Sequence, residues 1–217
     1  MSLPQRYGKR IRQLIGAVAV WLPGSPVPLG TLMARENGRF KQVGTLGDFT
    51  NVMAFAPHQE ASLNIASQGT RQRLFQAGVE LPSAAKLDLT AEASLRYEFS
   101  RKFDYVLKTP TLRGAHITNI NRIAAAVKGA AGWDHKAFFL VHETYEAEQF
   151  SFIGNEEQTS SLELSGKGAS ILNFLSAGAS ANLNRSGNAH VELLGEGGTL
   201  AMGLVRIRKD GTPDFVP

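Results

Sequence analysis

The side chains best suited to metal or acid–base chemistry are the five histidines, His58, His116, His135, His142 and His190. None stands in an HExxH arrangement or at another spacing by which one element presents several ligands to a metal. Because the chain has no cysteine, a metal would need nitrogen and oxygen ligands. We therefore predict structural or surface histidines and no metal site.

Three glutamates, Glu143, Glu146 and Glu148, could pair for general acid–base work. On a strand, however, Glu146 and Glu148 would share one face and Glu143 would lie on the other. A solvated face or a pore lumen is the favoured interpretation over a catalytic pair. Residues of a Ser-His-Asp site can come from anywhere in a chain, so an enzyme whose site is assembled only in space stays open as a hypothesis.

Glycine-rich stretches at 166–168 and 195–198 could in principle cradle phosphate groups. Neither completes a phosphate loop or a dinucleotide fingerprint, and no strand–glycine–helix unit surrounds them. The GxSxG nucleophile elbow is also missing from the sequence. We interpret both stretches as turns and predict a non-enzymatic protein with no catalytic residues and no cofactor.

Cations near the N-terminus form the strongest candidate binding site. Arg6, Lys9, Arg10 and Arg12 are the only charged side chains before Arg35. The chain has 23 Lys plus Arg and 19 Asp plus Glu, so the rest of it is formally neutral without these four. Such an arm indicates an anionic partner, either lipid headgroups or nucleic acid, although a merely solvated helix face has the same composition. The aromatic-interleaved basic motifs of single-strand binders are missing, so we expect anionic membrane lipids rather than nucleic acid.

The segment that carries these cations, residues 1–22, has helical periodicity. Its apolar residues recur at three- and four-residue intervals and are Tyr7, Ile11, Leu14, Ile15 and Val18. The cations lie largely off this stripe, an arrangement that suits an anionic membrane surface. The apolar run at 14–22 is far shorter than the ~20 residues of a membrane-spanning helix. It imitates a signal peptide, but bulky residues stand where the cleavage site would be, so we expect it to be retained.

The clearest pattern is an alternation from Lys86 to Ser100. Its apolar positions are Leu87, Leu89, Ala91, Ala93, Leu95, Tyr97 and Phe99, and every residue between them is polar. This period of two predicts a single strand, which at the usual rise would be roughly 50 Å long. The pattern by itself favours a sheet with one wet face, and it also fits a latent membrane hairpin. The lipid-facing candidates of such a hairpin are Leu87, Leu89, Leu95, Tyr97 and Phe99.

Other segments complete an α+β fold. Asn37-Gly38 favours a type I′ turn and predicts a hairpin of 29–35 with 39–46. Thr70–Ala77 reads as a short helix with Thr70 as N-cap and Gly78 as terminator. A second helix, at 117–128, would cover the apolar face of the long strand. Further strands are expected at 63–65, 137–153, 159–164, 189–194 and 200–208.

At 217 residues, 43% apolar and 19% charged, the chain fits one globular domain spanning 1–217. We expect a twisted, mainly antiparallel sheet with one long amphipathic strand, flanked by a few helices. The basic amphipathic segment at 1–22 precedes this body, and a short polar tail at 209–217 follows it.

The order of these patterns resembles the pore-forming domain of the bacterial gasdermins. The similar parts are a leading helix, the hairpin PVPLGTLMARENGRFKQVGTL, the alternating KLDLTAEASLRYEFS, a helix, FFLVHETYEAEQFSFI and the closing strand LAMGLVRIRK. The resemblance spans most of the chain and is one of order and pattern. It implies a twisted sheet whose long strands extend into membrane hairpins after activation, and a role in cell-death immunity against phage.

Two features of that family lack a counterpart here. Bacterial gasdermins carry a lipidated cysteine near the N-terminus, and they end in an inhibitory peptide, for which the nine residues after Arg208 are short. The activation route is therefore left open. We carry forward two functions: a membrane-directed, pore-forming effector that moves from the cytoplasm to the inner membrane face, and a non-catalytic sensor or adaptor domain of a multi-protein bacterial system. Anionic lipids, further copies of the chain or another protein would be the partners.

Overall fold

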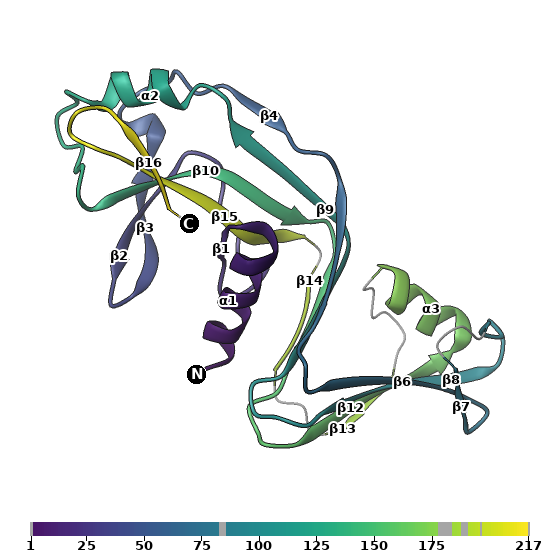
Figure 1. Ribbon diagram of the computed structural model, residues 1–217. Helices are drawn as coiled ribbons and strands as arrows, with labels where there is room; N and C mark the ends of the chain where they lie inside the picture. Colours follow the sequence, from purple (N-terminus) through teal and green to yellow (C-terminus); the bar gives the residue numbers. More distant parts are fainter. Residues whose placement is uncertain (1, 83–85, 178–183, 188–190, 196, 217) are drawn as a thin grey trace. The chain divides into compact units, whose positions relative to one another are not determined.

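Strands dominate the computed structural model, in which about 49% of the chain is strand and three helices accompany the strands in the described residues. The structure describes residues 2–82, 86–177, 184–187, 191–195 and 197–216 (Figure 1). The expected α+β class with a mainly antiparallel sheet is confirmed. The chain divides into a first unit, Met1–Tyr7, Ala61–Leu112 and Ala147–Gly197, and a second unit that contains the remaining segments. The single domain of the sequence analysis stays a prediction.

A five-stranded antiparallel sheet forms one part of the first unit, with strand order β13-β12-β8-β6-β7. The bounds are Thr70–Gln76 for β6, Val79–Leu81 for β7, Glu92–Phe99 for β8, Ser160–Lys167 for β12 and Asn184–Gly187 for β13. Helix α3, Gly168–Ala177, begins where β12 ends and lies over this sheet (Figure 1). Its Ile171 and Phe174 are fully buried against Leu95 and Tyr97 of β8. The core of this sheet therefore lies between one sheet face and α3.

The other part of the first unit is built on strand β9. The strands are β5 at Ala61–Ala66, β9 at Tyr105–Ile117, β11 at Phe150–Gly154 and β14 at Val191–Gly195. Antiparallel β5 and β11 flank the 105–112 half of β9, because Lys108 pairs with Asn64 on one side and with Ser151 on the other. Strand β14 then pairs with the outer edge of β11. Both edges of this half of β9 are thus paired with another strand.

The second unit continues β9 through residues 113–117. Its other elements are β1 at Val18–Ala19, β2 at Thr31–Glu36, β3 at Arg39–Thr45, the 3-10 turn η1 at Leu46–Asp48, β4 at Phe55–Pro57, α2 at Ile120–Val127, β10 at Phe138–Ala147, β15 at Gly198–Ile207 and β16 at Pro213–Val216. Consecutive residues of β10 enter different cores. Leu140 packs with Ile123 of α2, whereas Val141 packs with Val20 and Met202. A central strand buried on both faces explains the unbroken apolar run that the sequence shows there.

The predicted hairpin is confirmed. Strands β2 and β3 pair in antiparallel fashion and meet at Asn37 and Gly38, whose φ angles of 50° and 80° are those of a type I′ turn. A left-handed backbone at two successive positions is rarely adopted except by Asn, Asp and Gly. The local sequence therefore sets this turn without help from the rest of the fold.

The long strand expected at Lys86–Ser100 is only partly present, because β8 is limited to Glu92–Phe99. Asp88 ends the regular pairing: its Oδ1 accepts hydrogen bonds from the Thr90 backbone N–H and hydroxyl, which makes a local turn. The Gln76 side chain bonds both backbone groups of Asp88, at 2.8 and 3.1 Å. These contacts satisfy the hydrogen-bonding groups of the Asp88 backbone without pairing it to another strand. The alternating pattern in the sequence is therefore longer than strand β8.

The prediction of a helix at Thr70–Ala77 is wrong. Strand β6 occupies Thr70–Gln76 and pairs with β8, so that Leu74 lies beside Leu95 and joins the core under α3. Ala77 and Gly78, at φ of 50° and 79°, form the tight turn into β7. Gly78 thus serves a hairpin rather than a helix end. Pairing with a neighbouring strand outweighs the weak helix propensity of this segment.

Two further expectations need correction. The helix at 117–128 is present as the shorter α2, but it packs on β10 and β15 of the second unit, and α3 covers β8 instead. The tail after Arg208 is not simply a polar end, since β16 pairs with β15. Asp214 binds Arg206 at 2.9 Å and Arg208 at 3.2 Å, which holds β16 on that edge.

Candidate functional site

The N-terminal cations lie on helix α1, Leu3–Ile15. Leu3, Tyr7 and Ile11 form its buried stripe, each fully buried. The Tyr7 ring makes edge contacts with Tyr105 at 6.1 Å and Phe152 at 5.5 Å between ring centroids. Burial, with a smaller contribution from Tyr105, raises the pKa of Tyr7 far above its ordinary value, so its hydroxyl stays neutral. Tertiary packing therefore holds this helix in place.

The four cations differ in their partners. Arg6 Nη1 lies 3.3 Å from Oδ1 of Asp104, whose side chain is only 1% exposed. Ser67 also donates to that oxygen, at 2.9 Å, so the Arg6 charge is used internally. Lys9, Arg10 and Arg12 are exposed and form no ion pair with any residue that the structure describes. Only these three remain as a candidate anion-binding surface, which we call the basic face of α1.

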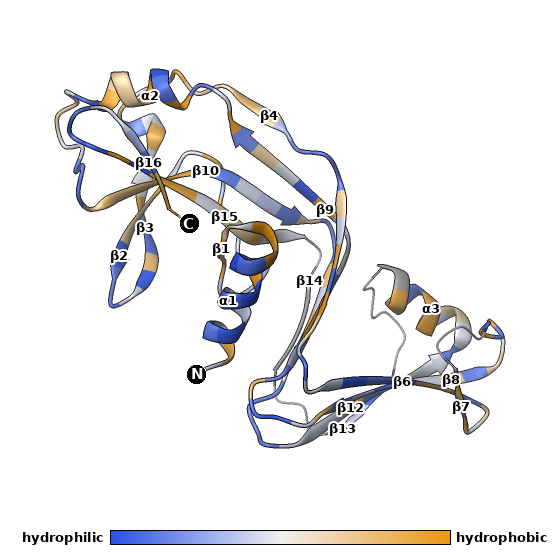
Figure 2. Ribbon diagram, viewed as in Figure 1, coloured by the Kyte–Doolittle hydropathy of each residue, from blue (hydrophilic) through white to orange (hydrophobic). Residues whose placement is uncertain are grey.

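The basic face carries uncompensated like charge. Lys9 and Arg12 lie three residues apart, and Arg6 precedes Arg10 by four, so the cations are neighbours on the helix surface. No acidic residue occurs in α1, and Figure 2 colours much of the helix as hydrophilic. Like charges at these spacings destabilise a helix by a few tenths of a kcal/mol each, roughly 0.2–0.5 per pair. An anion placed over this face would relieve that repulsion.

Most of the predicted membrane-hairpin side chains are covered by protein in this structure. Leu95, Tyr97 and Phe99 are buried on the face of β8 that α3 covers, with the Tyr97 and Phe174 rings 6.5 Å apart. Leu87 packs at the edge of the same core, while Leu89 is 49% exposed. Burial raises the pKa of Tyr97 well above its usual range, and its hydroxyl has no hydrogen-bond partner among the described residues. Lipid contact by this strand face would require α3 to leave it.

The opposite face of β8 carries a ladder of cross-strand ion pairs. Arg96 binds Glu163 of β12 at 2.7 Å, Arg73 of β6 binds Glu98 at 3.3 Å, and Lys167 binds Glu92 at 2.8 Å. All of these side chains are partly exposed. The polar positions of the alternation thus form the wet face of a sheet, which is the first of the two structures that the sequence allows.

The structure also gathers a cluster that sequence reasoning missed, the His58 cluster in the second unit. His58 Nε2 lies 2.8 Å from Glu143 Oε1, at ion-pair distance but without hydrogen-bond geometry. The His58 ring stacks on Tyr145 at 5.6 Å, and the His116 ring is 4.7 Å away. Burial raises the pKa of Tyr145 to about 12, and the charge of Glu143 adds to that shift. The pairing of β4 with β9 helps to bring these residues together. No local pattern in the sequence predicts this pairing.

In the part of the chain that the structure describes, the His58 cluster has neither the ligand set of a metal site nor a described pocket lined by its histidines. The neighbouring His142 has a lowered pKa, chiefly because burial disfavours its charged form. Within the described residues, no three His, Asp or Glu side chains converge as a metal ion would require. The described pockets are lined by other residues, and none of these is a histidine. The arrangement fits a stacked surface cluster better than an acid–base site facing a bound substrate.

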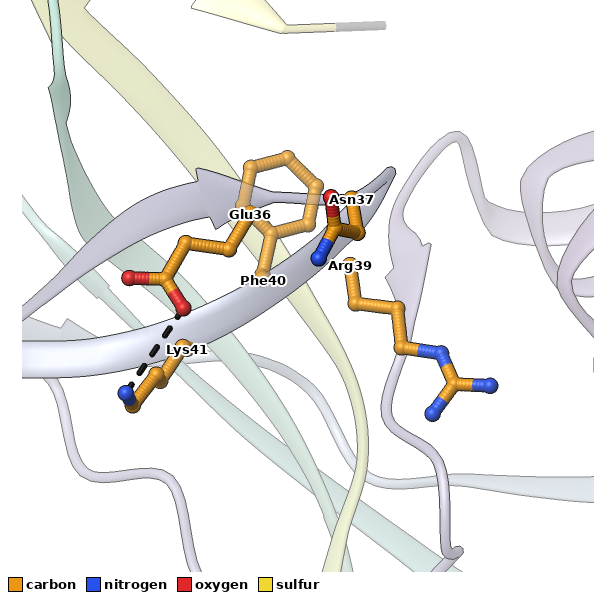
Figure 3. A pocket seen from close by; sticks show the side chains of 5 residues that line it. All are labelled: Glu36, Asn37, Arg39, Phe40 and Lys41. Carbon is orange, nitrogen blue, oxygen red and sulfur yellow. Dashed lines mark ion pairs between the residues drawn. The ribbon is translucent and has the colours of Figure 1, made fainter.

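Two described pockets lie in the second unit. One, of about 550 Å³, sits at the end of the β2–β3 hairpin, where Glu36 and Lys41 form an exposed ion pair at 3.6 Å (Figure 3). The other, of about 360 Å³, is lined by Met53 and Phe55 together with Glu146. Phe55 is 65% exposed there, so this groove presents apolar surface to solvent. Glu146 thus lines this pocket, whereas Glu143 belongs to the His58 cluster.

None of the helices in the described part of the chain is both long and apolar enough to cross a lipid bilayer. The glycine-rich stretch at 166–168 is the junction of β12 with α3 rather than a turn. Gly168 is required there, because a Cβ atom would lie 2.0 Å from the backbone oxygen of Asp88. The second stretch, 195–198, includes position 196, which lies outside the described residues.

No protein family and no curated protein matches this chain. The structure described as "Structure of a bacterial gasdermin from Bradyrhizobium tropiciagri" matches it with a TM-score of 0.40 and 14% identity, covering 97% of this chain and 90% of that one. This printed description names the same family that the sequence patterns resemble.

Proposed function

We propose that this protein is a membrane-directed effector whose basic face on α1 docks on anionic lipid headgroups. The observation that carries the proposal is the lack of any counter-charge for Lys9, Arg10 and Arg12 among the described residues. The helix is anchored by a buried stripe, so docking would not require it to unfold. Juxtamembrane cations contribute about 1 kcal/mol each to binding an anionic surface. The protein would act from the cytoplasm on the inner face of the membrane.

In the same proposal, pore formation and cell death follow after the protein has docked on the membrane. The apolar face of β8 is covered by α3 and the polar face is wet, so displacing α3 would give a strand with one face for lipid and one for water. Leu95, Tyr97 and Phe99 would then meet lipid. Dye release from vesicles is the measurement that separates this step from binding alone.

The deciding experiment neutralises the basic face. The triple variant Lys9→Gln, Arg10→Gln, Arg12→Gln should weaken co-sedimentation with phosphatidylglycerol vesicles by roughly 100-fold, as expected for three cations worth about 1 kcal/mol each. Its matched control is Arg122→Gln, Lys128→Gln, Lys136→Gln, which removes the same charge from other exposed positions. Equal losses in the two triple variants, or no binding of the unmodified protein to any anionic membrane, would sink the proposal.

A second candidate function is a non-catalytic domain that binds another protein. The groove beside Met53 and Phe55 supports it, because Phe55 is 65% exposed and Met53 39% exposed next to a hollow of about 360 Å³. A pull-down from native cells should then recover a defined partner that Phe55→Ser no longer retains. Recovery of the protein only as a free monomer would count against this function.

A further inference from the structure

Lys108 is a cation without a counter-charge inside the first unit. It lies on β9, three residues after the strand begins at Tyr105, and is only 8% exposed. Its ammonium group forms no hydrogen bond or ion pair with any residue that the structure describes. Burial alone lowers its pKa, and no nearby carboxylate contributes to the shift. The ammonium nitrogen is not itself fully enclosed, but a charge so largely removed from water is unfavourable unless something pairs with it.

A small pocket of about 190 Å³ adjoins Lys108. Asn64 lines it from β5 and is the direct cross-strand partner of Lys108, so the two side chains emerge on the same face. Ser62 lies on the same wall, two residues earlier. The side chains of Ser62 and Asn64 make no hydrogen bond to a described residue, whereas the Thr109 hydroxyl already donates to the Thr111 carbonyl at 3.0 Å. Three unused donors therefore line one hollow.

The chemistry of this lining selects for negative charge. An ammonium, an amide N–H₂ and a hydroxyl all donate hydrogen bonds, and no carboxylate lines the pocket. Leu175 of α3 and Pro110 provide an apolar wall that limits the size of an occupant. A water molecule takes about 30 Å³ of liquid volume, so the hollow has room for one phosphate-sized group with a few waters.

We propose that Lys108, Asn64 and Ser62 bind one small oxyanion of the phosphate type. This site is separate from the basic face of α1 and does not depend on membrane docking. The oxyanion supplies the counter-charge that the protein itself leaves out, and the ammonium regains its ordinary proton affinity when the anion is bound. Free phosphate and a lipid headgroup share this chemistry, so both are tested with soluble probes.

The test titrates the full chain with inorganic phosphate and, separately, with sn-glycerol 3-phosphate, using calorimetry and thermal denaturation. Saturable binding is expected, and Lys108→Met should weaken it at least tenfold because a charge-assisted hydrogen bond is lost. Without ligand, Lys108→Met should melt higher than the unmodified protein, since it removes an unpaired buried charge. Lys108→Arg should retain binding, and Lys86→Met, which removes an exposed cation, should leave it unchanged.

The outcomes separate the sources and can overturn the site. Tighter binding of glycerol 3-phosphate than of phosphate, with the same loss in Lys108→Met, assigns a headgroup, and the reverse order assigns the free ion. Affinity should fall as the pH rises through the lowered pKa of Lys108, because the neutral amine no longer attracts the anion. No saturable binding of either probe, or equal binding by Lys108→Met, rejects the site. Neither titration uses vesicles, so the test of this site is independent of the test of membrane docking.

Discussion

At the scale of single residues, Arg96 and Glu163 illustrate how the sheet satisfies its polar positions. Arg96 donates from Nε at 3.1 Å and from Nη2 at 2.7 Å to the same oxygen of Glu163. Antiparallel pairing places the two residues directly opposite each other on β8 and β12. The hydrogen bond from Arg96, and a second one from Ser94, hold the pKa of Glu163 below its ordinary value. The polar half of the alternation is thus explained by charge pairing.

The pairing of Arg96 with Glu163 predicts that the stability of the folded protein falls in acid. A carboxylate whose pKa is lower in the folded state stabilises the fold above its unfolded pKa, and that contribution is lost as the pH falls through the folded value. Glu163→Gln should therefore be less stable than the unmodified protein at neutral pH, with a difference that shrinks below about pH 4. Chemical denaturation between pH 7 and pH 3 measures it. Arg96→Met should mimic the effect, and the double variant should add little; a difference that does not shrink between pH 7 and pH 3 would contradict the assignment.

At the scale of elements, α3 decides what the alternating segment does. The apolar face of β8 is buried because α3 lies on it, through Ile171 and Phe174 (Figure 1). Close backbone contact between Gly168 and Asp88 fixes where α3 begins and where β8 ceases to be regular. The alternating sequence pattern predicts neither the packing of α3 on β8 nor the contact between Gly168 and Asp88. A helix with one apolar side and a strand with one apolar side are each incomplete until they meet.

Weakening α3 should therefore promote the membrane step. Phe174→Ala removes a fully buried ring and should cost about 3–5 kcal/mol, which loosens α3 from β8. Dye release from anionic vesicles should become faster. Ile123→Ala is the matched control, because it truncates a fully buried side chain of α2 in the second unit at a similar cost of about 2–5 kcal/mol. If both variants leak equally fast, general destabilisation rather than displacement of α3 is the cause.

At the scale of the whole molecule, the distribution of charge matters more than its sum. The net charge of +4 equals the contribution of the four N-terminal cations, and one of these is bound to a buried aspartate. The other charges of the described sheets are largely arranged in pairs. The long-range attraction of this protein for an anionic surface should therefore come from the basic face of α1.

This distribution predicts a steep effect of salt. Raising the ionic strength from 0.05 M to 0.5 M shortens the screening length to a few Å, about 4 Å, and should strongly weaken co-sedimentation with phosphatidylglycerol vesicles. The triple variant that lacks Lys9, Arg10 and Arg12 should bind weakly at both salt concentrations. Binding that is insensitive to salt would point to an apolar contact as the main attraction.

Several features could be predicted from the sequence because neighbours along the chain determine them. The period of two, the left-handed turn at Asn37-Gly38 and the cationic stripe of α1 follow from local spacing and backbone preference. The α+β class follows from the mixture of such patterns. The boundaries of β8 and the strand at Thr70–Gln76 do not follow, because the pairing of β6 with β8 outweighs local propensity.

Two kinds of information came only from the tertiary structure. One is which surfaces meet: α3 rather than α2 covers β8, and β4 brings His58 to Glu143, 85 residues away along the chain. The other is which charges lack partners, since the Arg6 side chain is bound to Asp104 whereas the ammonium groups of Lys9 and Lys108 are not bound to any described residue. The sequence by itself determined that a cationic helix and an alternating strand exist. Long-range packing decided which of their faces are covered, because burial and pairing depend on residues that are distant in sequence.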